Sequence, residues 1–307
     1  MKTVKLRSLA KINLDLRVLN KRPDGFHELR TVFQTISLAD TIEIQYEPAR
    51  RTRLEIDGNV NIPDNLILRA AQSALDAMRV RATVRFTLTK RIPMGAGLGG
   101  GSSNAAAVLL ALPALAKRNV SLEKIAAELG SDVPFFLTGG TAIGVGRGTE
   151  FYPLPDLAEE PILVVAPGIH SATGAAYAAL DRSLTFTGTS SSINSFQAYV
   201  RAIGVARRAG PASALSGNDF ESVVFRQHPQ LPAILKRLLK AGAIGARMTG
   251  SGSSVFAIFE SVAERARARK VLDGDRAFRG CRMVDARLTS RRNYQRMWER
   301  QLGRITG

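Results

Sequence analysis

The stretch of sequence that decides the fold class reads Pro93-Met94-Gly95-Ala96-Gly97-Leu98-Gly99-Gly100-Gly101-Ser102-Ser103. The segment Thr83 to Leu88 before this glycine loop alternates like a strand, and the apolar run Ala105 to Ala116 after it predicts a buried helix. Glycine has no Cβ, so several backbone N–H groups of such a loop can approach an anion, and the helix N-terminus adds partial positive charge. The glycine loop is therefore predicted to bind phosphate.

Three other interpretations of the glycine loop have to be weighed. A Walker A loop ends in Gly-Lys-Ser/Thr, and the absence of lysine between Pro93 and Ala116 excludes that motif. Gly95, Gly97 and Gly100 satisfy G-x-G-x-x-G, but the sequence about 20 residues further on indicates a helix and offers no acidic ribose ligand, which argues against a Rossmann site. A tight turn without a ligand stays open, although so many glycines carry an entropic cost that a plain turn does not require.

The sequence before the glycine loop is rich in strand signals. Val4 to Val18 has mostly apolar even positions and polar odd ones, which is the periodicity of a strand. A turn at Arg22-Pro23-Asp24-Gly25 follows, and then a second apolar run from Leu29 to Leu38. Asn65 to Met78 has apolar residues at helical spacing. We expect a β-rich opening to the chain.

The second half begins after a break at Glu159-Glu160-Pro161, so we predict two domains, residues 1–158 and 159–307. A buried strand is expected at Ile162 to Val165. The other elements expected on either side of this break are helices at Ser121 to Leu129, Leu231 to Lys240 and Val262 to Val271, and a strand at Val255 to Phe259. A second glycine-serine loop, Met248 to Ser254, precedes that strand, and two such loops in opposite halves suggest a shared cleft.

The charge of the chain points to an anionic partner. Hydrophobic residues make up 45% and charged residues 22% of the 307 residues, which is a globular balance, but the net charge is +17. Nucleic acid, a membrane surface and a phosphorylated small molecule are all compatible with this sign. Thirteen basic and five acidic residues lie between positions 261 and 307, so much of the excess belongs to the tail rather than to the glycine loop.

The sequence also bears on the compartment. Cys281 is the single cysteine, which excludes an intramolecular disulfide. The first 21 residues carry charges throughout and lack the apolar core of a signal peptide. The longest candidate membrane segment, Ala105 to Ala116, is far shorter than the roughly 20 residues that span a bilayer. We expect a cytoplasmic protein, a monomer or homodimer, without membrane contact.

Four segments of this chain resemble the GHMP kinases, and among them the kinases that act on 4-diphosphocytidyl-2-C-methyl-D-erythritol. The segments are Ala10-Lys11-Ile12-Asn13-Leu14 with Lys21-Arg22-Pro23-Asp24-Gly25-Phe26-His27, the stretch Pro93 to Ala107, Ser131-Asp132-Val133-Pro134-Phe135-Phe136, and Met248 to Phe256. Asn218-Asp219-Phe220-Glu221 fits as well. The general family shares only P-x-G-x-G-L-G-S-S, whereas G-L-G-G-G-S-S-N and K-R-x-D-G-F-H are similar to the diphosphocytidyl enzymes.

The resemblance implies an α+β fold with two lobes, an N-terminal β-rich nucleotide-binding domain and a C-terminal α/β domain with an antiparallel sheet. It implies ATP and Mg²⁺ as cofactors and, as the reaction, phosphorylation of the 2-hydroxyl of a substrate that carries a cytidine diphosphate group, in the non-mevalonate isoprenoid pathway. The implied catalytic pair is Lys11 and Asp132, with Asp132 orienting the hydroxyl and Lys11 stabilising the developing charge.

The resemblance also implies binding residues. For ATP they are Asn65 near the adenine and the loop residues Pro93, Gly95, Ala96, Gly97, Leu98, Gly99, Gly100, Gly101, Ser102 and Ser103, with Ser102 or Ser103 as a ligand of Mg²⁺. For the substrate they are Asn13, Phe26, His27, Tyr177, Gly250 and Ser251, in which Phe26 would stack on cytosine, His27 would form a hydrogen bond and Tyr177 would close the other face.

Each of these residues has a plainer interpretation that the sequence leaves open. Lys11 would serve as a solvated strand lysine, Asp132 as a helix-start carboxylate, Asn65 as an N-cap, and Phe26 and His27 as turn packing. The chain also departs from the family, since Phe26 stands where tyrosine is usual and Thr249, in the second loop, stands where serine is usual. No counterpart is evident for the arginine-rich tail beyond about Leu288.

Two other functions remain open from the sequence. The first is a GHMP kinase for another small alcohol such as mevalonate or homoserine. The second, from a different class, is a basic nucleic-acid-binding protein, which would explain the charge and the tail. The chain has no aromatic residues interleaved with basic ones, no recognition module and no zinc motif, so we expect no nucleic acid as partner.

Overall fold

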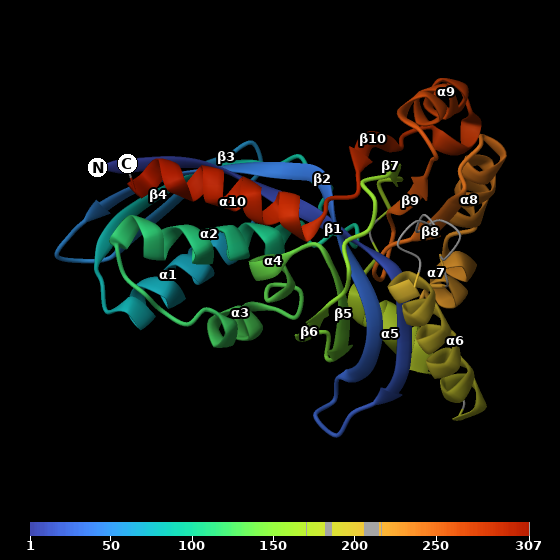
Figure 1. Cartoon of the computed structure of the whole chain (residues 1–307), viewed down its shortest axis with the longest axis horizontal. Coiled ribbons are helices and arrows are strands. Elements are labelled where there is room, and N and C mark those ends of the chain that lie inside the picture. Colours follow the sequence, from blue (N-terminus) through green and yellow to red (C-terminus); the bar gives the residue numbers. More distant parts are fainter. Residues whose placement is uncertain (170, 182–185, 206–214, 216, 307) are drawn as a thin grey trace.

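Two β-sheets and the helices packed on them form two lobes (Figure 1). The structure is a computed structural model, and it describes the whole chain except residues 170, 182–185, 206–214, 216 and 307. A mixed sheet with helices lies in one lobe, and an antiparallel sheet with helices lies in the other, which confirms the α+β fold class.

Strands β1 (Lys2–Lys21) and β2 (His27–Pro48) form a long antiparallel pair that connects the two lobes (Figure 1). The two strands predicted here are confirmed, and each is longer than its sequence signal. The pairing shifts register at Leu9/Ala10 and again at Asn13/Asp15. Such bulges bend a strand and redirect its side chains, so the pair can leave the first lobe and pass beside the second.

The first sheet has six strands, in the order β3-β4-β2-β5-β6 with β1 paired to β2. Its pairs are antiparallel except β3 with β4, which is parallel. The added strands are β3 (Arg53–Gly58), β4 (Ala82–Thr89), β5 (Thr141–Gly146) and β6 (Glu150–Pro153). The helices of this lobe are α1 (Leu66–Met78), α2 (Gly100–Ala116), α3 (Glu123–Leu129) and α4 (Phe135–Thr138).

The second sheet has four antiparallel strands in the order β10-β7-β9-β8, as predicted for the C-terminal half. The strands are β7 (Pro161–Ala166), β8 (Gly245–Met248), β9 (Val255–Ile258) and β10 (Arg282–Arg287). The helices are α5 (Thr173–Asp181), α6 (Phe186–Val205), α7 (Glu221–Gln227), α8 (Gln230–Lys240), α9 (Val262–Leu272) and a 3₁₀ turn, Arg276–Phe278.

Three clusters of buried apolar side chains hold these layers together. One fills the first lobe between its sheet and helices α1 and α2, and a second lies between the antiparallel sheet and helices α7 to α9. The third joins the lobes, because it combines Ile12 and Leu14 of β1 with Val164 of β7 and Phe256 of β9. The lobes therefore share a core, which fixes the position of β1 between them.

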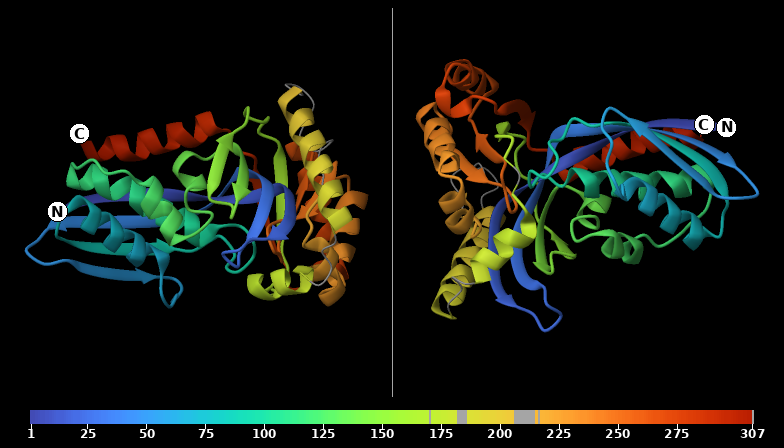
Figure 2. Two further views of the ribbon diagram at one scale, coloured as in Figure 1. Left: turned by 90° about the horizontal axis from the view of Figure 1, so that it is seen from below. Right: turned by 180° about the vertical axis from the view of Figure 1, so that it is seen from behind.

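The arginine-rich tail forms helix α10 (Arg291–Thr306), which returns to the first lobe (Figures 1 and 2). Tyr294 and Trp298 are buried in the core of that lobe, and the Tyr294 hydroxyl donates a hydrogen bond of 2.6 Å to the carbonyl of Phe136. An apolar helix face thus anchors the tail, while Arg292, Arg296 and Arg300 are exposed. The domain division at residues 158 and 159 stays a prediction.

Most predicted helices agree with the structure, and two differ at their starts. The helix expected from Ala105 begins at Gly100, within the glycine loop. The helix expected to be capped by Ser121 begins at Glu123, and the Ser121 hydroxyl donates to the Glu123 carboxylate instead of accepting from the backbone. A search of the described residues finds no helix with the length and apolar character needed to cross a bilayer.

Glu160, just before β7, gives the fold a pH-dependent element. Burial raises the pKa of Glu160 to about 7, and its Oε2 accepts no hydrogen bond from the described residues. Between pH 4.5, its ordinary pKa, and about 7 the folded chain binds more protons than the unfolded chain, so the free energy of unfolding falls as pH rises.

We therefore expect Glu160→Gln to stabilise the protein at pH 8 by about 1 kcal/mol, a value kept small because the side chain is only half buried. At pH 4 the two proteins should have equal stability, since the native side chain is then neutral in both states. Urea unfolding at the two pH values measures this difference. Equal stabilisation at both values would contradict the assignment to the charge of Glu160.

Candidate active site

A cavity of about 630 Å³ lies where the two lobes meet. The glycine loop forms one wall from Pro93 to Ser102, and the second loop contributes Gly250, Ser251 and Gly252. Residues of β1, β2 and α5 and the turn from Gly130 to Asp132 also line the cavity. The shared cleft predicted from the two glycine-serine loops is therefore present.

The glycine loop takes a conformation that requires glycine. Gly95, Gly97 and Gly99 have φ angles of 61°, 76° and 67°, and α2 begins at Gly100 directly after them. The Lys11 amide donates to the carbonyl of Leu98 at 3.0 Å, which fixes the loop to β1. The loop therefore presents its backbone to the cavity at a helix N-terminus, the arrangement expected of an anion site.

The two loops touch at Gly97. A Cβ on Gly97 would lie 2.2 Å from the carbonyl oxygen of Thr249, so no larger residue fits there. The Thr249 hydroxyl donates to the carbonyl of Gly97 at 3.3 Å, and the Ser254 amide donates to the carbonyl of Ala96 at 3.3 Å. The side-chain amide of Asn218 holds the second loop through the carbonyls of Met248 and Gly250.

Lys11 and Asp132 come together at this cavity. The Lys11 Nζ lies 3.4 Å from Asp132 Oδ2 and donates to Asn13 Oδ1 at 2.7 Å. Lys11 is only 4% exposed, so the structure contradicts the interpretation as a solvated strand lysine. Asp132 lies in the turn before α4 and lines the cavity, with its side chain 26% exposed. The pair can therefore act on a bound group.

Asn13 connects the Lys11 ammonium to both lobes. Its Nδ2 donates to the Thr31 hydroxyl at 2.8 Å, and its backbone amide donates to the Thr249 hydroxyl at 3.0 Å. Asn13 is 3% exposed, so its amide orientation is set by these partners. Strand β1, the glycine loop and the second loop are thereby fixed around the Lys11 ammonium.

Aromatic side chains lie at the other end of the cavity. The rings of His27 and Tyr177 stack with centroids 4.6 Å apart, and Tyr177 meets the edge of Phe220. Burial and then the nearby charge of Asp132 raise the pKa of Tyr177, so its hydroxyl stays a donor. Phe26 is half exposed, and the guanidinium of Arg147, which lines the cavity, lies 3.5 Å from its ring centroid.

The remaining predicted residues occupy different positions. Asn65 caps α1, since its Oδ1 accepts from the Ile67 amide at 3.0 Å, while its neighbour Leu66 lines the cavity. Ser102 lines the cavity at the first turn of α2, whereas Ser103 is buried with no hydrogen-bond partner for its hydroxyl among the described residues. Asn65, Ser103, Phe26 and His27 are absent from the cavity lining.

Lys90, Arg147 and Thr173 are among the lining residues that the sequence did not predict. Lys90 forms a buried ion pair with Asp40, and its Nζ lies 2.6 Å from where a Cβ on Gly100 would stand. Burial lowers the pKa of Lys90, although Asp40 opposes this shift. In the sequence, only the position of Lys90, three residues before Pro93, could have indicated that it lies at the cavity. A lysine at the end of a strand is too common to support that prediction.

The residues that line the cavity form two groups with different chemistry. Backbone amides and Lys90 surround the space at the start of α2, which suits a phosphate. Lys11 and Asp132 line the same cavity, and a hydroxyl placed beside the pair would meet both an acceptor and a positive charge. The cavity can therefore hold a phosphorylated ligand and an alcohol at the same time.

Comparison with known protein families gives matches in both halves of the chain. The family model of the GHMP kinases N terminal domain matches residues 65–140, and that of the GHMP kinases C terminal region matches residues 199–273. A curated protein of Solibacter usitatus, named 4-diphosphocytidyl-2-C-methyl-D-erythritol kinase, is 53% identical over 98% of this chain and 93% of its own length.

Solved structures also match this chain over most of its length. A crystal structure of a 4-(cytidine 5'-diphospho)-2C-methyl-D-erythritol kinase matches 93% of this chain and 99% of its own with a TM-score of 0.75 and 36% identity. Homoserine kinase from Cytophaga hutchinsonii matches 94% of this chain and 95% of its own with a TM-score of 0.73, but at 16% identity this likeness bears on the fold alone.

Proposed function

This chain belongs to the GHMP kinase family, and we propose that it transfers the γ-phosphoryl group of ATP to the 2-hydroxyl of 4-diphosphocytidyl-2-C-methyl-D-erythritol, in the non-mevalonate isoprenoid pathway of the cytoplasm. The observation that carries the proposal is the ion pair of Lys11 and Asp132, which lines the same cavity as the glycine loop. The relative with 53% identity, named for this substrate, supports the choice of alcohol.

The glycine loop is the proposed ATP site. Its amides at the start of α2 would hold the phosphates, with Lys90 close to Gly100 as an additional cation. The residues proposed to contact ATP are the predicted loop residues that line the cavity, Pro93 and Gly95 to Ser102, whereas Ser103 is buried beneath them. Asn65 acts indirectly in this proposal, because it caps α1 and so positions Leu66 at the cavity.

The proposed transfer forms a bond between the substrate oxygen and the γ-phosphorus while the bond from that phosphorus to ADP breaks. Asp132 accepts the hydrogen bond of the hydroxyl, orients it in line and takes its proton as the new bond forms. Lys11, held by Asn13, stays beside the reacting oxygens and stabilises the charge on the transferred group. The hydrogen bonds around Asn13 set this geometry before the substrates bind.

Mg²⁺ is part of the proposal. Ser102 fits it as a ligand, because its side chain lines the cavity at the start of α2 and forms no hydrogen bond within the described residues. No group of three or more His, Cys, Asp or Glu side chains suited to a metal occurs among the described residues, which agrees with an ion that takes few protein ligands and binds mainly phosphates and water. Bound there, Mg²⁺ would neutralise phosphate charge.

The cytidine end of the substrate is assigned to the aromatic side of the cavity. His27 and Tyr177 form a stacked pair there, and Arg147 provides a cation suited to a diphosphate. Arg147 covers one face of the half-exposed Phe26 ring, and Phe26 is absent from the cavity lining, so it is proposed as a contact made on binding. Gly250 and Ser251 border the same space.

A coupled kinase assay tests the function. ATP consumption is expected with 4-diphosphocytidyl-2-C-methyl-D-erythritol and is expected to be far weaker with mevalonate or homoserine. Turnover of mevalonate or homoserine at a higher kcat/KM would overturn the proposed substrate while keeping the family. No turnover with any alcohol would overturn the proposed reaction.

Gly97→Ala is expected to raise the KM for ATP by roughly tenfold or more. The left-handed φ costs alanine about 1–2 kcal/mol, and its Cβ would also meet the Thr249 carbonyl, so the glycine loop must move. Steady-state kinetics at varied ATP concentration measures this change.

Gly280→Ala is the matched control for Gly97→Ala. Gly280 also has a left-handed φ, 77°, but a Cβ there meets nothing within 4 Å, and it lies outside the cavity. This variant should therefore show the backbone strain alone, with an unchanged KM for ATP. Equal effects of both substitutions on KM would contradict the role given to the contact between the loops.

A further inference from the structure

A second cavity, of about 790 Å³, lies outside the candidate active site, and none of its lining residues borders the first cavity. Helix α10 and strand β1 form two of its sides. We call it the basic groove, because six cations line it: Lys5, Arg7, Arg91, Arg287, Arg296 and Arg300. One carboxylate, that of Glu159, is also present.

Four of the six cations of the basic groove come from strand β1 and helix α10. Lys5 and Arg7 occupy alternate positions of β1, which point to one side of a strand. Arg296 and Arg300 are four residues apart on α10, so they share one side of that helix. The sequence thus places positive charges of β1 and α10 opposite each other where the tail returns to the first lobe. Charges of the same sign repel each other.

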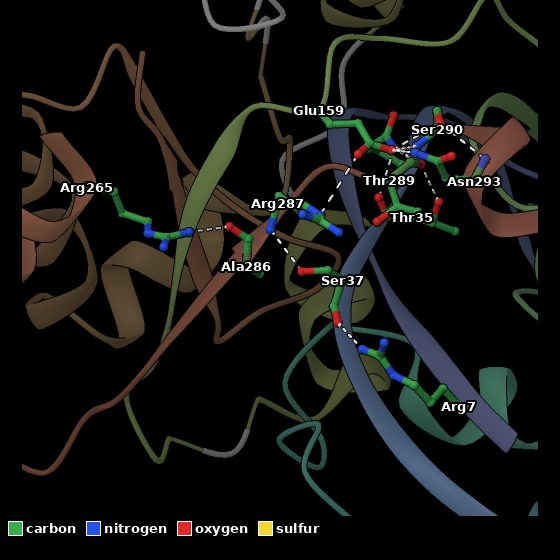
Figure 3. Close-up of polar contacts among 11 residues, drawn as sticks. Arg7, Thr35, Ser37, Glu159, Arg265, Ala286, Arg287, Thr289, Ser290 and Asn293 are labelled. Carbon is green, nitrogen blue, oxygen red and sulfur yellow. Dashed lines mark hydrogen bonds and ion pairs between the residues drawn. The ribbon is translucent and has the colours of Figure 1, made fainter. Parts of the chain in front are cut away.

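The carboxylate of Glu159 is already occupied (Figure 3). Its Oε1 accepts from Asn293 at 2.6 Å and from the amide and hydroxyl of Ser290, while its Oε2 lies 3.9 Å from the Arg287 Nε. It fixes the start of α10 and offers little to the remaining cations. The Arg7 guanidinium donates to the carbonyl of Ser37 at 3.2 Å, beside the Arg287 backbone (Figure 3).

The other four cations keep their donors free. Within the described residues, Lys5, Arg91, Arg296 and Arg300 form no ion pair and no side-chain hydrogen bond, and all four are exposed. Arginine presents planar pairs of N–H groups that match phosphate oxygens. Several converging cations without acceptors form a site that an anion with more than one phosphate would satisfy.

We propose that the basic groove is a second binding site, specific for a small molecule that carries a di- or triphosphate. The volume falls within the range of small-molecule sites, roughly 300–1,000 Å³. A nucleic acid is the less suitable ligand, because the groove offers no aromatic side chain on which a base could stack. Leu9 and Met297 supply apolar contact beside the cations.

Calorimetric titration of the full chain with inorganic triphosphate tests the proposal. Two sites are expected, one at the glycine loop and one in the basic groove. The double variant R296Q/R300Q should weaken one site by roughly tenfold, since each exposed arginine contributes a modest and screened share. Gly97→Ala should weaken the site at the glycine loop. A failure of the proposed ATP site and a failure of the proposed site in the basic groove can therefore be distinguished.

The matched control is R226Q/R279Q, which removes the same two charges from exposed arginines outside the groove and outside α10. It should leave both sites unchanged. A single site in the native chain, or equal weakening in both double variants, would overturn the proposal. Binding of a single-stranded oligonucleotide that depends on Arg296 and Arg300, without saturable triphosphate binding there, would overturn it in favour of nucleic acid.

Discussion

Asp132→Asn is expected to lower kcat by about 10² to 10⁴, the range typical of a general base, with little change in the KM for either substrate. Asparagine keeps the shape of the side chain but cannot accept the proton of the alcohol. It also places a neutral amide 3.4 Å from the Lys11 ammonium, where the native carboxylate forms an ion pair. Steady-state kinetics with both substrates measures the effect.

The control for this variant is the binding of a non-hydrolysable ATP analogue, which should match that of the native chain because the glycine loop is unchanged. Near-normal turnover would contradict the role of Asp132. A loss confined to the KM for the alcohol would mean that this carboxylate binds the substrate without taking part in the transfer.

The sequence predicted the parts of this site that follow from local patterns. The alternation around Lys11 and the glycines from Gly95 to Gly101 specify a strand and an anion loop, and both are present. Alternation also suggested that the polar face of β1 is solvated. The structure buries that face only from Lys11 to Asp15, where the second lobe covers it and Thr249 bonds to Asn13.

Other features depend on long-range pairing that no local pattern encodes. Helix α10 packs on the first lobe through Tyr294 and Trp298, yet its sequence is dominated by arginine. Lys90 enters the site because Asp40, fifty residues away in the chain, binds it and also accepts from the Ile92 amide. A contact between residues so far apart in the chain cannot be predicted from the periodicity of either segment.

Lys11→Met is expected to lower kcat by roughly 10² to 10³, the loss typical for removal of one group that stabilises transition-state charge. Methionine fills a similar volume in this buried position, and the Lys11 backbone amide still donates to the carbonyl of Leu98, so the glycine loop stays anchored. The KM for ATP should change little. Lys124→Met, at an exposed position outside the cavity, is the control and should leave kcat unchanged.

The double variant K11M/D132N tests whether Lys11 and Asp132 act together in catalysis or contribute independently. Groups that act as a unit lose their effect together, so the double variant should be about as slow as the slower single variant. Independent contributions would instead multiply, and the combined loss would be the product of the two. A multiplicative result would refute the coupling between Lys11 and Asp132, even if each single variant behaved as expected.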